Sequence, residues 1–243
     1  MPFLEIIVDT VEDAIAAETG GATQLALLSH YPSTGVTPSF GMVARIYEKV
    51  RIPVIVLLCP HTRGYIPSEE DLETCLRDIE VFKKIGIHDF LIGFIDQTNN
   101  LNIQAVGKIR AAHPDIHLHN RIIWEFSRDI QQTVETAIAL GFLSMRTSGN
   151  HMQNIMVNGD MMETMRNIKL IKDTANKRIA VLLTGGITAA NAEFIMSQSG
   201  IFDLQIGRGV RSPSNSYSPV DPQKVAILRS KQISVFEDFN LKN

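Results

Sequence analysis

Two glycine clusters in the chain have the residue types of an anion site. Gly185 and Gly186 directly follow one short apolar run, and Gly207, Arg208 and Gly209 directly follow the next. Glycine lets backbone amides approach an oxyanion closely, and an arginine adds charge-assisted hydrogen bonds to the same oxygens. The pattern predicts a site for a phosphate-sized anion at both clusters. The alternative is that the glycines only form tight turns and that Arg208 is solvated.

Two carboxylates and an arginine are candidates for acid–base chemistry. Glu5 and Asp9 have the same side-chain parity in the apolar run 3–9, so both belong to one face of a strand. A buried carboxylate must be paired or protonated, which leaves Glu5 either a site residue or a structural one. Asp9 is followed by VEDA and could instead cap the first helix. We predict Glu5, Asp9 and Arg121 as catalytic residues, with Arg121 holding an anion.

Three further clusters have simpler explanations than the chemistry they suggest. His117 and His119 share a strand face, but no matching group of ligands with metal spacing occurs elsewhere, so no metal site is predicted. Cys59 with His61 could form a thiolate–imidazole pair, yet a buried, unreactive thiol is expected. Five methionines could ligate copper, whereas helix packing explains the last three: Met152, Met156, Met161, Met162 and Met165. No cofactor is predicted.

The elements that must position these residues alternate along the whole chain. Eight β-rich apolar runs are separated by segments with helical spacing. Eight strands alternating with eight helices are typical of a (β/α)8 TIM barrel, an α/β fold, and we predict a single domain over 1–243. The expected strands are 3–9, 23–29, 53–59, 89–95, 116–122, 142–148, 179–185 and 202–208. The expected helices are 11–21, 39–50, 69–86, 103–113, 129–141, 160–175, 189–200 and 221–236.

The barrel interpretation gathers the candidate residues at one face. Active sites of such barrels lie at the carboxyl ends of the strands. The polar residues Asn120, Thr147 and Ser148 stand there, and we predict that they bind the ligand together with the glycine clusters. Thr188 is expected to cap the helix after the first cluster. The longest loops, 30–38, 59–68 and 147–159, also follow strands.

Composition limits the classes of partner. The 243 residues are 44% hydrophobic and carry a formal net charge of −3, without the basic face expected of a nucleic-acid binder. Two cysteines provide no disulfide framework. The chain starts without a signal-peptide pattern and has no apolar stretch long enough to span a membrane. We expect a cytoplasmic protein with a small anionic ligand, no nucleic-acid or membrane partner, and, on base rates alone, a homodimer.

Several motifs resemble the CutC family, the so-called copper homeostasis proteins. They are LEIIVDTVEDAIAAETGGATQLAL, GVTPSFGMV, IPVIVLLCP, TSG (147–149) and GGIT (185–188), and they extend over almost the whole chain. The resemblance implies a TIM barrel and a role in copper handling, without an assigned reaction. The chain retains the following polar residues of the family pattern: Glu5, Asp9, Thr37, Arg121, Thr147 and Ser148. Because of this resemblance, Thr37 is added to the predicted ligand-binding residues.

The chain departs from the family pattern at most of its ionisable positions. Ala26 stands where the family has glutamate, Leu28 where it has cysteine, and Asn120 where it has histidine. Four more replacements are Cys59 and His61 for arginines, Gly64 for aspartate, and Trp124 for aspartate. In the opposite direction, QIGRGV resembles the phosphate-binding G-R-G of orotidine-phosphate decarboxylase-like barrels.

Three functions remain open from the sequence. The first is binding or transforming a small phosphorylated or anionic metabolite, as a lyase or isomerase if the protein is an enzyme. The second is copper handling, and the third is non-catalytic ligand binding or assembly. The lost ionisable residues favour a changed or absent chemistry over that of the relatives, while the glycine clusters favour a ligand site.

Overall fold

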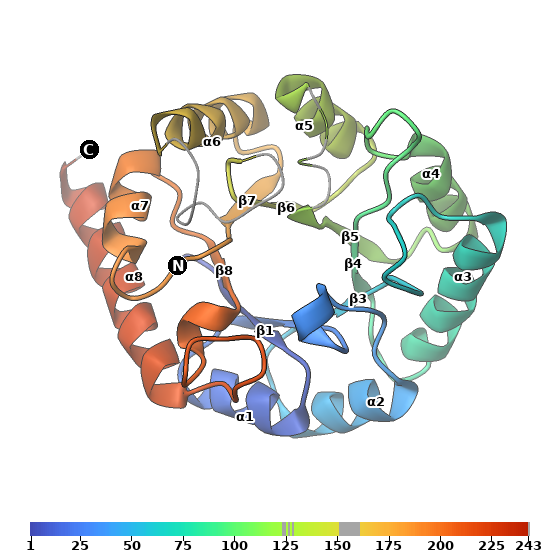
Figure 1. Cartoon of the computed structure of the whole chain (residues 1–243), viewed down its shortest axis with the longest axis horizontal. Helices are drawn as coiled ribbons and strands as arrows, with labels where there is room; N and C mark the ends of the chain where they lie inside the picture. The colour runs from blue at the N-terminus through green and yellow to red at the C-terminus, as the bar shows by residue number, and fades with distance from the viewer. Residues whose placement is uncertain (123–124, 126, 128, 151–160, 243) are drawn as a thin grey trace.

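The computed structural model describes residues 1–122, 125, 127, 129–150 and 161–242, and these form a closed barrel of eight parallel strands surrounded by helices (Figure 1). The strands neighbour one another in chain order, and β8 pairs with β1 to close the ring. The predicted TIM-barrel fold is therefore confirmed. The strands are β1 (Leu4–Val8), β2 (Gln24–Leu27), β3 (Val54–Leu57), β4 (Asp89–Ile92), β5 (His117–Asn120), β6 (Ser144–Thr147), β7 (Ala180–Leu183) and β8 (Leu204–Ile206).

Helices follow the strands around the outside of the ring. They are α1 (Val11–Thr19), α2 (Phe40–Lys49), α3 (Glu69–Lys83), α4 (Ile103–Ala112), α5 (Ile130–Ala139), α6 (Met161–Ala175), α7 (Ala192–Ser199) and α8 (Pro222–Lys242). Two short 3₁₀ helices, η1 (Tyr31–Ser33) and η3 (Arg208–Val210), lie in the loops after β2 and β8.

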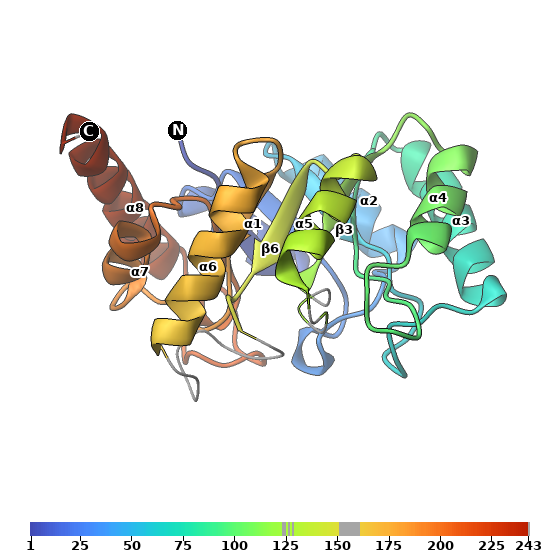
Figure 2. The ribbon, with the colours of Figure 1, turned by 90° about the horizontal axis from the view of Figure 1, so that it is seen from above.

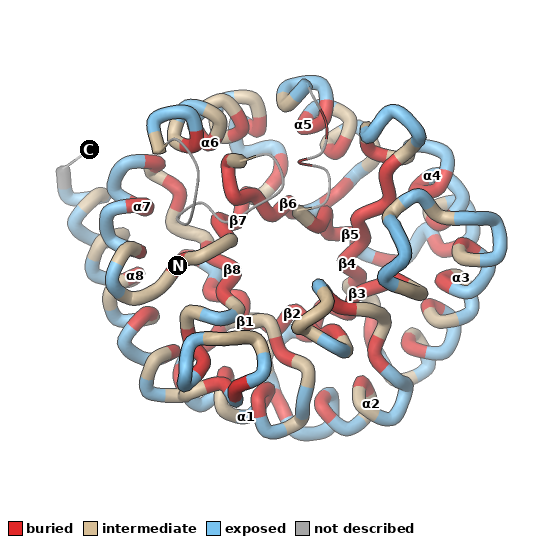
Figure 3. The backbone as a smooth tube through the Cα atoms, viewed as in Figure 1, coloured by how far each residue is buried: buried red, intermediate tan, exposed pale blue. Residues whose placement is uncertain are grey.

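Alternation along the strands builds two apolar layers. Leu4, Ile6 and Val8 of β1 point outward and share the large core between strands and helices. A smaller cluster around Leu57 and Leu91 fills part of the barrel interior. Because both faces of most strands are covered, most of the runs are nearly continuous apolar sequence, whereas β5 (HLHN) and β6 (SMRT) carry polar residues. Figure 3 shows the result, with buried strands and exposed outer faces on the helices.

Side-chain caps start most of the helices. Thr10 caps α1 by accepting a hydrogen bond from the Asp13 amide at 3.0 Å, so the suggestion that Asp9 caps this helix is wrong. The expectation that Thr188 caps the next-to-last helix is also wrong. Asn191 is the N-cap residue of α7, and Thr188 lies in the turn before it, where its amide donates to Asn191 Oδ1 at 2.8 Å.

The loops that follow the strands lie on one side of the ring, and the N-terminus lies on the other (Figure 2). The loop that carries η1 reaches inward over the barrel opening. The barrel thus brings the strand ends to one face, as the sequence predicts. No helix in the described part of the chain is long and apolar enough to cross a membrane.

Candidate functional site

A cavity of about 310 Å³ opens between the ends of β7 and β8. Both glycine clusters line it, as does Thr184, the residue just after β7. Gly185 and Gly186 have φ of 82° and 78°, a left-handed conformation that glycine adopts without strain. Within the described ranges, the amides of Gly185, Gly186 and Gly207 donate no hydrogen bond to the protein. The cavity therefore presents backbone donors that a ligand can use.

The second cluster is shaped by contact with the loop after β2. A Cβ on Gly207 would lie 1.8 Å from the Tyr31 hydroxyl, and one on Gly209 would lie 2.0 Å from the Ile187 carbonyl oxygen. The Arg208 backbone hydrogen-bonds to the Tyr31 oxygen, and burial raises the pKa of this tyrosine. The Arg208 side chain is exposed at the cavity rim. Glycine is thus required here for close approach of other groups, and the Arg208 amide already has a partner.

Glu5 lies inside the barrel rather than at its opening. It is fully buried and forms an ion pair with the fully buried Arg146, whose Nε donates to Glu5 Oε1 at 3.0 Å and whose Nη2 donates to Oε2. Gln24 and Gln205 each donate to the same carboxylate at 2.7 Å. Burial opposes ionisation of Glu5, but Arg146 prevails and holds its pKa below the usual value. This carboxylate links β1 to β2, β6 and β8 and is not placed to exchange protons with a ligand.

The same polar network continues to the opposite side of the barrel. Arg146 donates to the Ser144 hydroxyl at 2.7 Å, and that hydroxyl lies 2.6 Å from His119 Nδ1. His119 Nε2 lies 2.9 Å from Asp89, which also faces His117 at 3.3 Å. Burial lowers the pKa of His119. Both ring nitrogens of His119 are bonded to protein atoms, which favours a structural role over metal ligation.

Asp9 belongs to a different part of the opening. It lines a cavity of about 440 Å³ with Arg211, whose Nη2 lies 3.3 Å from Asp9 Oδ1 and whose Nη1 lies 2.8 Å from Asp13. Arg211 is buried and lies over the Tyr31 ring, 5.0 Å from its centroid. Tyr31 lines the cavity at the glycine clusters, and its ring contacts Arg211 of the second cavity. The structure does not bring Asp9 and Glu5 together.

Thr147 and Ser148 bind a carboxylate, but it is one of the chain's own. Glu125 Oε1 accepts from the Thr147 hydroxyl and the Ser148 amide, both at 2.6 Å, and from the Gly149 amide at 3.1 Å. Its Oε2 accepts from the Ser148 hydroxyl at 2.6 Å. Burial raises the pKa of Glu125 to about 7, against the effect of these hydrogen bonds. Both predicted ligand-binding residues are thus occupied by Glu125, which the sequence analysis did not single out.

Arg121 and Thr37 hold the loop after β2 in place. Arg121 Nη2 donates to the Thr34 carbonyl oxygen, and its guanidinium lies 5.9 Å from the centre of the Tyr65 ring. Thr37 Oγ1 accepts from the Cys59 amide at 2.9 Å, and the Thr37 amide donates to the Cys59 carbonyl oxygen at the same distance. These side chains are buried or half-buried and organise the opening.

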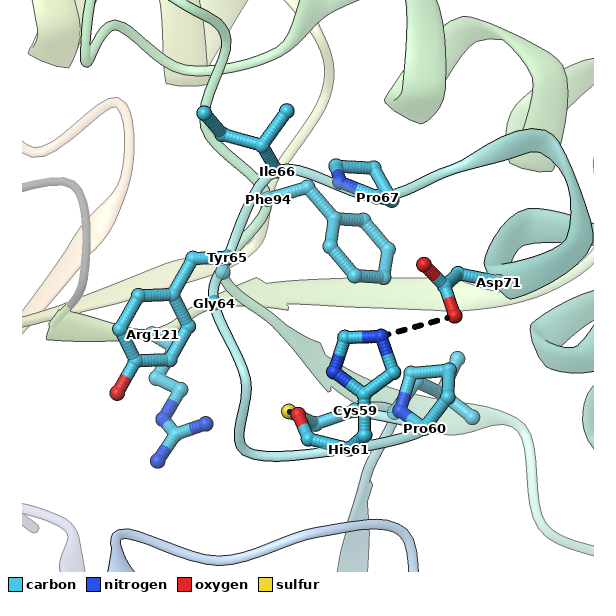
Figure 4. A pocket seen from close by; sticks show the side chains of 12 residues that line it. Cys59, Pro60, His61, Gly64, Tyr65, Ile66, Pro67, Asp71, Phe94 and Arg121 are labelled. Carbon is cyan, nitrogen blue, oxygen red and sulfur yellow. Dashed lines mark hydrogen bonds and ion pairs between the residues drawn. The ribbon is translucent and has the colours of Figure 1, made fainter.

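Figure 4 shows the pocket that Arg121 lines. The volume of this pocket, about 10 Å³, is close to the least space that one water molecule needs. The Cys59 thiol donates to the His61 carbonyl oxygen at 3.2 Å, and burial raises its pKa against the effect of Arg121. His61 Nε2 lies 3.1 Å from Asp71, and its Nδ1 accepts from the Arg63 amide at 3.3 Å. His61 therefore faces Asp71 and not the thiol, in agreement with a buried, unreactive Cys59.

The remaining candidates lie apart from these cavities. Asn120 is fully buried, and neither end of its amide has a partner among the described residues. Its strand neighbour His119 points into the barrel, so Asn120 points outward. Met165 packs against the core, whereas Met162 is 71% exposed, so packing does not explain Met162 as expected. Trp124, Met152 and Met156 lie outside the described residues.

Comparisons with known proteins place the chain in one family. The sequence profile of the CutC family matches residues 3–209. The human copper homeostasis protein cutC homolog is 28% identical over 197 residues, which are 81% of this chain and 70% of the relative. A CutC family protein from Xanthomonas campestris pv. campestris (strain B100) is 27% identical over 197 residues, 81% of this chain and 79% of the relative.

Solved structures agree on the fold. The CutC protein from Streptococcus agalactiae superposes with a TM-score of 0.75 at 21% identity, covering 85% of this chain and 98% of the other. Phosphoribosyl anthranilate isomerase from Thermotoga maritima gives a TM-score of 0.65 at 13% identity, covering 96% and 100%. At these identities the likeness shows the barrel fold alone.

Proposed function

The chain belongs to the CutC family, and from this premise we propose that it binds a small phosphorylated or otherwise anionic metabolite at the carboxyl-terminal face of its barrel. The observation that carries the proposal is the 310 Å³ cavity lined by both glycine clusters. The amides of Gly185, Gly186 and Gly207, which have no partner among the described residues, would donate to anionic oxygens, and the Arg208 guanidinium would add charge from the rim.

The cavity offers groups that can bind an anion but few that could exchange protons with it. The titratable residues among the described lining of this cavity are Tyr31 and Arg208. Glu5 is held by Arg146, and Asp9 lines the neighbouring cavity. A lyase or isomerase reaction would need an acid or base that reaches the bound anion, and none of the three predicted catalytic residues lines this cavity. We therefore propose a ligand-binding barrel without assigning it a reaction.

Copper handling is the second candidate, because the human relative is named a copper homeostasis protein. The described residues include no group of three His, Cys, Asp or Glu side chains gathered to hold a metal. Cys59 and Cys75 are both buried, and burial raises the pKa of each thiol. Cu(I) prefers thiolate and thioether ligands, so these thiols are poor candidates as they stand.

Loss of the Arg208 side chain tests the anion site. A hydrogen bond to a charged group contributes about 1.5–3 kcal/mol, so Arg208→Ala should weaken binding of inorganic phosphate about ten- to hundredfold. Isothermal titration calorimetry measures the dissociation constant. Arg45→Ala, which removes an exposed arginine on α2, is the matched control and should leave binding unchanged.

An unchanged dissociation constant in Arg208→Ala, or no phosphate binding by the wild-type protein, would overturn the proposal. Gly186→Val should also weaken binding by blocking the backbone. Because Gly186 has a left-handed φ of 78°, the valine is strained there and the variant should melt at a lower temperature as well. Arg208→Ala is therefore the cleaner test.

A further inference from the structure

The buried polar network reaches the floor of the proposed anion cavity. Gln205 and Thr184 both line this cavity and are both buried. Gln205 Nε2 donates to Glu5 Oε1 at 2.7 Å, and the Thr184 hydroxyl donates to Gln205 Oε1 at 3.1 Å. The cavity floor is thus tied through Glu5 to Arg146 in the centre of the barrel.

The direction of each hydrogen bond in this chain is fixed by chemistry. Glu5 is ion-paired with Arg146, and an ionised carboxylate only accepts hydrogen bonds. Gln205 must therefore turn its NH₂ group toward Glu5, which leaves its carbonyl oxygen facing Thr184. The opposite amide orientation would place that carbonyl oxygen against the Glu5 carboxylate. Consequently the single hydroxyl proton of Thr184 is committed to Gln205.

Because the Thr184 hydroxyl donates its proton to Gln205, it can only accept a hydrogen bond from a ligand. Its hydroxyl oxygen still has lone pairs, and in the described part of the chain Gln205 is the one partner recorded for this hydroxyl. Thr184 also directly precedes Gly185, whose amide donates to no group in the described ranges of the chain. The cavity therefore places a hydrogen-bond acceptor immediately beside its hydrogen-bond donors. An anionic oxygen suits the donors but is repelled by the acceptor.

We infer that the cavity selects anions that carry a hydroxyl close to the anionic group, with the amides of the glycine clusters holding the anion and Thr184 accepting the ligand's hydroxyl proton. The ligand class is a phosphate monoester of a polyol. This inference rests on the proposed anion site and adds the chemical identity of the group next to the anion. Thr184 acts as a specificity-determining residue, and Gln205 acts as a positioning residue that orients it.

Two phosphate esters of matched size test the inference. Glycerol 3-phosphate carries hydroxyls beside its phosphate ester, and n-propyl phosphate lacks them. Wild-type protein should bind glycerol 3-phosphate about three- to tenfold more tightly, as expected for one neutral hydrogen bond. Thr184→Val keeps the side-chain shape but removes the hydroxyl, so it should abolish this preference. Thr184→Val should therefore weaken binding of glycerol 3-phosphate more than binding of n-propyl phosphate, which has no hydroxyl on its propyl chain for Thr184 to accept from.

Two further variants separate a direct role of Thr184 from damage to the fold. Thr184→Ser keeps the hydroxyl and should keep the preference. Gln205→Leu frees the Thr184 proton and should reduce the preference while phosphate still binds. If wild-type protein binds both esters equally, or if Thr184→Val retains the preference, the inference is wrong while the anion site stands. If neither inorganic phosphate nor either ester binds the wild-type protein, the proposed function fails and the inference fails with it.

Discussion

At the level of single residues, Glu5 and Glu125 are two buried carboxylates whose surroundings shift their pKa values in opposite directions. A carboxylate in a buried strand must be paired, and Glu5 is paired. Its partner Arg146 was not identified because 141 positions separate the two residues, and only closure of the barrel brings them together. An arginine inside the apolar run 142–148 was nevertheless a signal, since a buried guanidinium also needs an anion.

The pKa of Glu125 is shifted in the opposite direction to that of Glu5, and ionisation of this buried carboxylate lowers the free energy of unfolding. Burial raises its folded-state pKa to about 7, whereas an unfolded glutamate titrates near 4.5. Between these two pH values the folded state binds more protons than the unfolded state, so the free energy of unfolding falls as the pH rises. The contribution lost across this window is on the order of 3 kcal/mol.

Replacement of Glu125 by glutamine should remove this dependence. The amide oxygen can still accept from Thr147, Ser148 and Gly149, and the amide NH₂ can donate to the Ser148 hydroxyl. We expect Glu125→Gln to gain stability relative to wild type as the pH rises from about 4.5 to 7, and to keep a constant advantage above that. Urea unfolding across this range measures the difference.

Glu80→Gln, at an exposed position of α3, is the control for loss of one negative charge. It should show no comparable rise in relative stability across the same pH range. A difference between Glu125→Gln and wild type that stays constant from pH 4.5 to 8 would contradict the prediction.

At the level of elements, all eight strands and eight helices were predictable because their patterns are local. Apolar runs and helical spacing are written in consecutive residues, and caps such as Thr10 and Ser68 complete the helix starts. The errors lie at boundaries. The sequence favours a helix from 189, but α7 begins at Ala192 because Thr188 and Asn191 bond to each other across a turn.

The loops after the strands were harder to interpret than the strands themselves. Gly207 is predicted to approach a ligand, and the structure shows its close approach to the Tyr31 hydroxyl from the loop after β2. Thr147 and Ser148 were expected to bind a ligand, and they bind Glu125. Such loop contacts join segments that are distant in sequence, so periodicity and composition carry no signal for them.

At the level of the whole molecule, the barrel separates residues that the sequence grouped into one site. The glycine clusters line one cavity, Asp9 lines a second, and Arg121 lines a small third pocket. All follow strands and share one face, as expected, but each belongs to a different sector of the ring. The predicted anion site survives as a proposal because its residues come from the adjacent strands β7 and β8.

The barrel's outer surface bears on the expected homodimer. Phe194 on α7 and Ile227 on α8 are each 51% exposed, and two-fold dimers are the commonest assembly of soluble proteins. We predict a dimer with twice the monomer mass of 27.0 kDa. Light scattering at micromolar concentration checks this, and a mass of one chain would contradict it.

Copper binding by the whole chain is predicted to be weak, which separates this protein from the function that its relatives' names state. The chain has two cysteines, Cys59 in the barrel interior and Cys75 in the buried face of α3, and burial raises the pKa of both thiols. Forming a Cu(I)–thiolate bond would require each thiol to lose its proton where burial disfavours the charge. In competition with a Cu(I) chelator the protein should therefore take up little copper, and Cys59→Ser should change this uptake no more than Cys75→Ala does. Tight stoichiometric uptake that Cys59→Ser abolishes would show that Cys59 binds copper, and it would return copper handling to first place among the candidate functions.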